Sequence, residues 1–162
     1  MRGKLTIVPL REHSGCIPLF ARCFEQEWPA WYGPGGQGNA MADLTAFANP
    51  AGDLPVGVVA RAADGAWVGV AALKAVSIPE FAHLGPWAAA GYVAPGLRRQ
   101  GIGAALLAGL LAEARRLGFA TVYCATATAG SLLERQGWRL LERTRHDDKP
   151  TAIYAIDVTR RG

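Results

Sequence analysis

Two arginines and two glycines stand where the sequence predicts the start of a helix, and this combination is typical of an anion-binding site. Arg98 and Arg99 precede Gly101 and Gly103, and an apolar helical segment follows them. The first backbone N–H groups of a helix have no partners within the helix and carry the positive end of its dipole. Because glycine has no side chain, these N–H groups stay accessible to a bulky anion. The spacing therefore predicts a phosphate site.

The residues around the two glycines distinguish between kinds of phosphate loop. A Walker loop needs a lysine and then a serine or threonine where this chain has Ile102 and Gly103. A dinucleotide-binding loop needs a third glycine where the chain has Leu106. It also needs an acidic residue about 20 residues further on, in a region (123–126) that contains none. The sequence thus disfavours both a nucleoside triphosphate and NAD.

The strand, turn and helix start together resemble the acyl-CoA loop of the GCN5-related N-acetyltransferase (GNAT) superfamily. That family has the pattern Gln/Arg-x-x-Gly-x-Gly/Ala after a strand and a proline turn, with an apolar helix after the glycines. The matching residues here are Tyr92, Val93 and Pro95, followed by Arg98, Gly101 and Gly103. The resemblance is strong from Leu84 to Trp138 and loose elsewhere. It implies an N-acetyltransferase that moves an acetyl group from acetyl-CoA to a primary amine by direct attack.

The same resemblance implies which residues would hold the cofactor. Backbone N–H groups at the helix start would bind the pyrophosphate, and the side chains of Arg98 and Arg99 would add charge. In the family, the donor to the developing oxyanion is the backbone N–H at the end of the preceding strand, which corresponds to Val93. The expected cofactor-binding residues are Tyr92, Val93, Arg98, Arg99, Gln100, Gly101, Gly103, Ala104 and Ser131.

Transfer to an amine also needs a group that removes a proton. An alkyl ammonium has a pKa of about 10.4, so a base or a water chain must deprotonate it before attack. The candidates are His83 and Glu27, followed by Glu25 and Glu80. His83 precedes the strand that ends at Val93, where the family often places its base. The alternatives are a solvated loop histidine, and glutamates that form an exposed helix end or bind a cationic acceptor.

The leaving thiolate marks a departure from the family pattern. Many members carry a tyrosine that is placed to protonate the sulfur, four residues before a Gly-Phe pair. In this chain Gly137 and Trp138 occupy the place of that pair, and Leu133 occupies the tyrosine position. Either no general acid is used, or another residue replaces the tyrosine. The candidates for that replacement are Ser131, Thr126, Tyr123 and Cys124.

Aromatic residues form the expected acceptor wall, and these are Trp28, Trp31, Tyr32 and Trp87. A glycine-rich segment, 31–39, is interpreted as a mobile loop over the substrate side. Trp87 fits the core equally well, and Trp67 and Trp138 are expected in the core. A closing aromatic loop favours a small-molecule amine as the acceptor. The alternatives are a protein or peptide amine acetyltransferase, and a catalytically degenerate acyl-CoA-binding protein.

Length and composition indicate one domain, 1–162. Three cysteines without metal-ligand spacing, and the lack of an apolar leader, predict a cytoplasmic protein with free thiols and no membrane segment. The segment from Arg98 onward carries a net charge of +5 and the preceding one −1, which suits a polyanionic cofactor. The basic residues do not interleave with aromatics, which argues against nucleic acid. We expect a monomer or homodimer without a metal.

Hydrophobic periodicity and turn residues predict a sequence of alternating elements. Strands are expected at 4–8, 56–62, 66–76, 86–93, 120–126, 138–144 and 151–158, and helices at 14–28, 41–48, 101–117 and 130–136. Gly91 indicates a bulge, and a turn over 145–150 would close the last hairpin. The pattern is α/β. With the resemblance, it implies a single-domain GNAT fold: a mixed, mostly antiparallel central sheet with one parallel pair splayed at the cofactor site, and helices on both faces.

Overall fold

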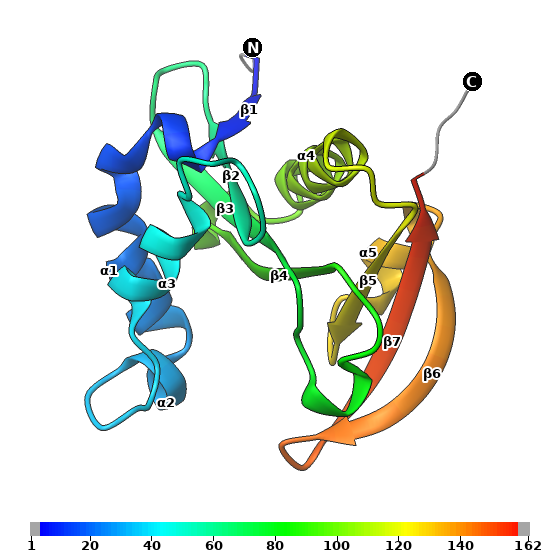
Figure 1. The fold of residues 1–162 in the computed structure, drawn as a ribbon. Helices are drawn as coiled ribbons and strands as arrows, with labels where there is room; N and C mark the ends of the chain where they lie inside the picture. The colour runs from blue at the N-terminus through cyan, green and yellow to red at the C-terminus, as the bar shows by residue number, and fades with distance from the viewer. Residues whose placement is uncertain (1–3, 159–162) are drawn as a thin grey trace.

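The computed structural model describes residues 4–158, which form a seven-stranded sheet flanked by helices (Figure 1). The strands are β1 (Thr6–Pro9), β2 (Val56–Arg61), β3 (Trp67–Lys74), β4 (Trp87–Val93), β5 (Thr121–Thr126), β6 (Arg139–His146) and β7 (Lys149–Asp157). The helices are α1 (Ile17–Glu27), α2 (Pro29–Tyr32), α3 (Ala40–Phe47), α4 (Ile102–Arg116) and α5 (Gly130–Arg135). Short 3₁₀ turns are η1 (Leu10–Glu12), η2 (Ser14–Cys16), η3 (Pro79–Phe81) and η4 (Pro95–Leu97). The two ends of the predicted domain lie outside the described residues.

Strand order across the sheet is β1-β2-β3-β4-β5-β7-β6. Every neighbouring pair is antiparallel except β4 with β5, which are parallel because the crossover helix α4 joins them. The parallel strands pair only at Trp87 with Tyr123 and at Ala88 with Cys124. Beyond these pairs the strands diverge, as Figure 1 shows. The predicted mixed, mostly antiparallel sheet with one splayed parallel pair is confirmed.

Helices cover both faces of the sheet, and each face has its own hydrophobic core (Figure 1). On one face, Phe20, Phe24 and Leu44 of α1 and α3 pack with strand residues such as Val59. On the other face, α4 buries residues spaced by four, which return to the same side of a helix: Ile102, Leu106, Leu110 and Ala114. Within residues 4–158, no helix has both the length and the apolar character needed to cross a bilayer.

β4 contains the bulge that the glycine at position 91 predicts. The register between β3 and β4 shifts between Val70 and Ala72, so the extra residue of β4 lies between Ala89 and Tyr92. The left-handed backbone falls on Ala90, with φ of 56°, rather than on the glycine. A residue with a Cβ atom adopts this conformation at a cost of about 1–2 kcal/mol. Because bulges bend and twist a strand, this one changes the direction of the end of β4.

The final hairpin differs from its prediction. The sequence predicts a turn over 145–150, whereas β6 continues to His146 and β7 begins at Lys149. The turn consists of Asp147 and Asp148, whose φ values are 52° and 63°. A two-residue turn with positive φ at both positions matches the twist of antiparallel strands, and aspartate tolerates this region better than most residues. The predicted turn is therefore wrong, and the hairpin is a longer arm.

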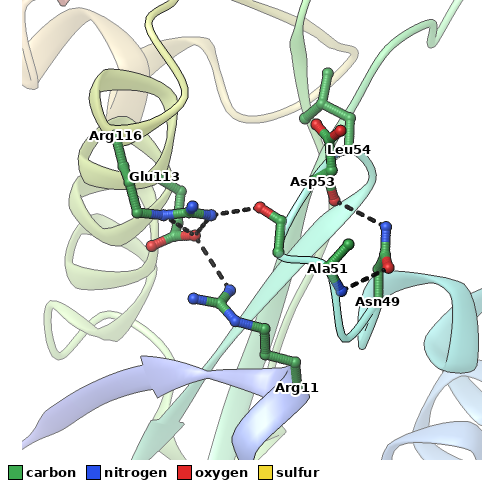
Figure 2. Close-up of polar contacts among 8 residues, drawn as sticks. Arg11, Asn49, Ala51, Asp53, Leu54, Glu113 and Arg116 are labelled. Carbon is green, nitrogen blue, oxygen red and sulfur yellow. Dashed lines mark hydrogen bonds and ion pairs between the residues drawn. The ribbon is translucent and has the colours of Figure 1, made fainter.

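A polar cluster joins the C-terminal end of α4 to two other segments, as Figure 2 shows. Oε1 of Glu113 accepts hydrogen bonds from Arg116 at 2.7 Å and from Arg11 at 3.4 Å. Nη2 of Arg116 donates to the carbonyl oxygen of Gly52 at 2.6 Å. The Asn49 side chain stabilises the loop that contains Gly52. It donates to the carbonyl oxygen of Asp53 and accepts from the N–H of Ala51. The cluster holds α4 against the start of the chain.

Replacing Glu113 by alanine should lower the free energy of unfolding by about 1–3 kcal/mol. The reason is that Arg11, whose side chain is 20% exposed, and Arg116 lose their shared acceptor. Denaturant titration followed by circular dichroism measures the change. The matched control is Arg115→Ala, an exposed position of the same helix, which should change stability by less than about 0.5 kcal/mol. Equal stabilities of the two variants would contradict a stabilising role for the cluster.

Candidate active site

The predicted phosphate loop folds into a cradle at the N-terminus of α4. η4 turns the chain after β4, and Arg99 and Gly101 then adopt positive φ values of 66° and 90°. A Cβ atom built on Gly101 would meet nothing within 4 Å, and one on Gly103 would meet only Leu132, at 3.6 Å. The N–H groups of the first helical turn therefore border open space, which is the arrangement that binds a phosphate.

Strand register shows where the backbone N–H of Val93 points. The N–H of Ala94 donates to the carbonyl oxygen of Val68 in β3, at 2.9 Å. Because successive residues of a strand direct their N–H groups to opposite sides, the N–H of Val93 faces away from β3. On that side β5 has already separated from β4, since their last pair is Ala88 with Cys124. The N–H of Val93 is therefore directed into the gap between the splayed strands.

Arg98 links the end of β4 to α1. Its Nε donates to the carbonyl oxygen of Val93 at 2.8 Å, and its Nη2 lies 2.9 Å from Oε1 of Glu27. The guanidinium carbon is 5.7 Å from the centre of the Tyr92 ring, within the range of a cation–π contact. Both arginines expected at the phosphate are exposed, and the charge of Arg98 is directed toward α1.

An open cleft of about 420 Å³ lies between the end of α1 and the β6–β7 hairpin. Four segments line it: the corner after α1, the connection before η3, the end of β5, and the hairpin tip. Its aromatic and polar lining residues are Trp28, Ser77, Thr126, His146, Asp147, Lys149 and Thr151. Sequence reasoning identifies only Trp28 of these as an acceptor residue. The remaining lining residues could have been predicted from their position at the ends of strands, next to the parallel pair that separates.

The four aromatic residues of the expected acceptor wall have different positions. Trp28 lines the cleft and packs edge-on against Phe24, with ring centroids 5.0 Å apart. The hydroxyl of Tyr32 donates to Asp43 at 2.6 Å, which ties the start of the glycine-rich loop to α3. Trp31 is 51% exposed and packs against the Tyr32 ring. Trp87 is fully buried and donates from its indole N–H to Leu84, so it belongs to the core and not to a wall.

None of the four candidate bases lines the cleft, and their surroundings differ. Glu27 is ion-paired with Arg98 and directly precedes Trp28, which lines the cleft. His83 is exposed, is absent from the cleft lining, and stacks on Phe81 with ring centroids 6.2 Å apart. Glu25 and Glu80 are exposed. Glu27 is therefore the candidate that the structure links to the end of β4, through Arg98, and that directly precedes a residue of the cleft lining.

The candidates for a general acid are mostly engaged or buried. Leu133, at the family's tyrosine position, is 1% exposed in the core. Oγ1 of Thr126 accepts hydrogen bonds from the N–H groups of Thr128 and Ala129, and Tyr123 packs on the ring of Trp87. Ser131 is exposed in the first turn of α5. Burial raises the pKa of the Cys124 thiol to about 12, which disfavours a covalent route through its thiolate.

A model of the acetyltransferase (GNAT) family matches residues 20–138 of the chain. The matched range contains the cradle at the start of α4, the end of β4 and the splayed strands. It ends before the β6–β7 hairpin, which contributes one side of the cleft. No curated protein sequence matches the chain.

Solved structures of acetyltransferases share the fold at low sequence identity. An aminoglycoside 6'-N-acetyltransferase from Enterococcus faecium has a TM-score of 0.75 and 17% identity, over 97% of this chain and 99% of that one. The ribosomal-protein-S18-alanine N-acetyltransferase from Escherichia coli has a TM-score of 0.68 and 18% identity, over 98% and 97%. An aminoglycoside 6'-N-acetyltransferase crystallised with coenzyme A has a TM-score of 0.72 and 15% identity, over 97% and 99%.

Proposed function

The chain belongs to the acetyltransferase (GNAT) family, and from that membership we propose that it acetylates the primary amine of a small molecule by direct transfer from acetyl-CoA. Members of this family are acyl-CoA-dependent acetyltransferases, so the chain is a transferase with acetyl-CoA as its cofactor. Beyond family membership, we propose that an amide bond is formed and that the acceptor is a small-molecule amine.

The observation that carries the proposal is the position of Val93 between the phosphate cradle and the cleft. Its N–H is directed into the gap between the splayed strands, and the cradle begins a few residues later in the chain. The adjacent residue, Tyr92, contacts Trp28 of the cleft, with ring centroids 6.5 Å apart. An acyl group held near Val93 would therefore have the cofactor on one side and an acceptor on the other.

The residues of the cradle fit acetyl-CoA. Backbone N–H groups of the loop and the first turn of α4 would hold the pyrophosphate: Arg99, Gln100, Gly101, Gly103 and Ala104. Leu132 lies 3.6 Å from the point that a Cβ atom of Gly103 would occupy, so the first turn of α5, which contains Ser131, is beside the start of α4. The cofactor supplies an acetyl group activated as a thioester. The N–H of Val93 would donate to the thioester oxygen as negative charge develops on it, with Tyr92 alongside.

Two proton movements accompany the transfer. We assign removal of the ammonium proton to Glu27, directly or through one water. Arg98 links its carboxylate to the carbonyl oxygen of Val93, and the next residue, Trp28, lines the cleft. The amine nitrogen would then form a bond to the acetyl carbon while the carbon–sulfur bond breaks, and the second proton that the nitrogen loses would pass through water to the departing thiolate. With Leu133 buried at the tyrosine position, the thiolate would leave without a tyrosine donor. The high pKa of Cys124 favours this single displacement over an acyl-enzyme route.

Glu27→Gln should lower kcat by about 100-fold, because an amide cannot accept the ammonium proton. Calorimetry should show unchanged affinity for acetyl-CoA, because glutamine keeps a side-chain oxygen that can accept the hydrogen bond from Arg98. Glu25→Gln is the matched control, an exposed carboxylate of the same helix end, and should stay within about twofold of the original rate. A Glu27→Gln enzyme of full activity would exclude Glu27 and direct attention to His83.

Thiol release from acetyl-CoA with a panel of amines, together with the mass of the products, tests the proposed function. A gain of one acetyl group on a small amine would support it. The panel includes peptides, because a protein-acetylating enzyme is among the structures that share the fold. Acetylation of peptides alone would assign the acceptor to proteins. Tight acetyl-CoA binding without amine-dependent thiol release would favour a binding protein, the alternative that the buried Leu133 motivates.

A further inference from the structure

The hairpin tip presents two nitrogen groups to the cleft from one face. His146 of β6 and Lys149 of β7 are direct partners across the hairpin, and both line the cleft. Side chains of directly opposite residues lie on the same face of a sheet, with Cβ atoms about 5 Å apart. Thr151, two residues along β7 and therefore on that face, also lines the cleft. The tip thus carries an ammonium and an imidazole side by side.

The cleft offers little negative charge to a polycation. Among the residues of 4–158 that line it, Asp147 is the sole carboxylate, and its side chain is 85% exposed. Its Oδ2 lies 3.5 Å from Nε2 of His146, so part of its charge is directed to the imidazole. No ion pair of Lys149 is found within the described residues. Complementarity of charge governs which ligands enter such a cleft.

Two other carboxylates of the hairpin lie outside the cleft lining: Glu142, on the same face as His146, and Asp148 of the turn. Arg145 is opposite Pro150, on the face away from His146, and its Nη2 donates to the carbonyl oxygen of Asp148 at 2.6 Å. On the far side of the cleft, Glu27 is paired with Arg98. At the hairpin an acceptor therefore meets the ammonium of Lys149, the imidazole of His146 and the exposed carboxylate of Asp147. Glu27, the residue before Trp28, is already paired.

We propose that the acceptor amine also carries an anionic group, a carboxylate or a phosphate, which Lys149 binds with the help of His146. This inference rests on the proposed function and narrows its acceptor. The anionic end lies at the hairpin tip, and the amine end lies beside Trp28 and the end of β5. Polycationic amines such as aminoglycosides are poor substrates, although enzymes that act on aminoglycosides share the fold.

Matched acceptor pairs test the proposal, with thiol release as the readout. The pairs are β-alanine with its amide and 2-aminoethyl phosphate with 2-aminoethanol, and the polycations are kanamycin and spermidine. The anionic member of at least one pair should have a kcat/KM at least about tenfold above that of its neutral partner. Lys149→Ala should remove this preference by raising KM about tenfold at unchanged kcat, with neutral amines unaffected. Lys149→Glu should invert the preference toward the polycations.

Arg139→Ala is the matched control, because Arg139 lies at the other end of β6 and pairs with Asp157. It should keep the preference for the anionic acceptors. Equal rates within both pairs, or kanamycin as the best acceptor of the original enzyme, would overturn the inference and leave the amine acetyltransferase intact. A complete lack of thiol release with every amine, while acetyl-CoA still binds in calorimetry, would overturn the proposed function itself.

Discussion

Gly101→Glu should weaken acetyl-CoA binding at least about 100-fold, which corresponds to about 2.7 kcal/mol at 25 °C. Gly101 is the residue before α4, and a side chain there would project into the open space at the helix start. That space is where a pyrophosphate would meet the unpaired N–H groups, and a carboxylate would both fill it and repel the phosphates. Isothermal titration calorimetry with acetyl-CoA measures the loss.

A glycine just beyond the other end of α4 provides the control for backbone strain. Gly118, just after α4, has φ of 88°, close to the 90° of Gly101, and its Cβ position is also open. Gly118→Glu should therefore cost similar stability, about 1–2 kcal/mol, because both positions force a side chain into the left-handed region. It should leave acetyl-CoA affinity unchanged. If both variants bound acetyl-CoA equally well, the phosphate would not be held at the start of α4.

The cradle could be predicted from the sequence because its determinants are local. A proline turn, two arginines and two glycines lie within ten residues of one another, and the apolar residues that fix α4 follow at a spacing of four. The stop at Gly118 is equally local, since a glycine after two arginines ends the helix in the left-handed conformation. Each of these features depends on its neighbours in the chain.

The acceptor cleft could not be predicted in the same way, because it forms from segments far apart in sequence. Lys149 and Trp28 are far apart in the sequence but line the same cleft. They come together because β7 pairs with β5 and α1 packs on one face of the sheet. The length of the hairpin arm depends on two aspartates in the left-handed region, which composition does not distinguish from a longer turn. Trp87 was equally compatible with wall and core, and only packing against Ile78 and Ile153 decides between them.

Arg98 connects the two halves of the proposed site through one guanidinium. It donates to the carbonyl oxygen of Val93 and to the carboxylate of Glu27, and so links the end of β4 to the end of α1. The planar fork of arginine suits two acceptors in different directions, which a lysine ammonium would hold less rigidly. The residue that the sequence motif places at the cofactor loop therefore also positions the proposed oxyanion donor and the proposed base.

Val93→Pro should lower kcat by about 100- to 1,000-fold, because proline has no N–H to donate to the developing oxyanion. The N–H of Val93 faces the gap and not β3, so no hydrogen bond of the sheet is lost, and the extended backbone of Tyr92 is compatible with a following proline. Val93→Ala is the control, since it trims the same side chain and keeps the N–H. Circular dichroism and acetyl-CoA affinity should match in the two variants. A proline variant as fast as the alanine variant would show that the thioester oxygen is stabilised elsewhere.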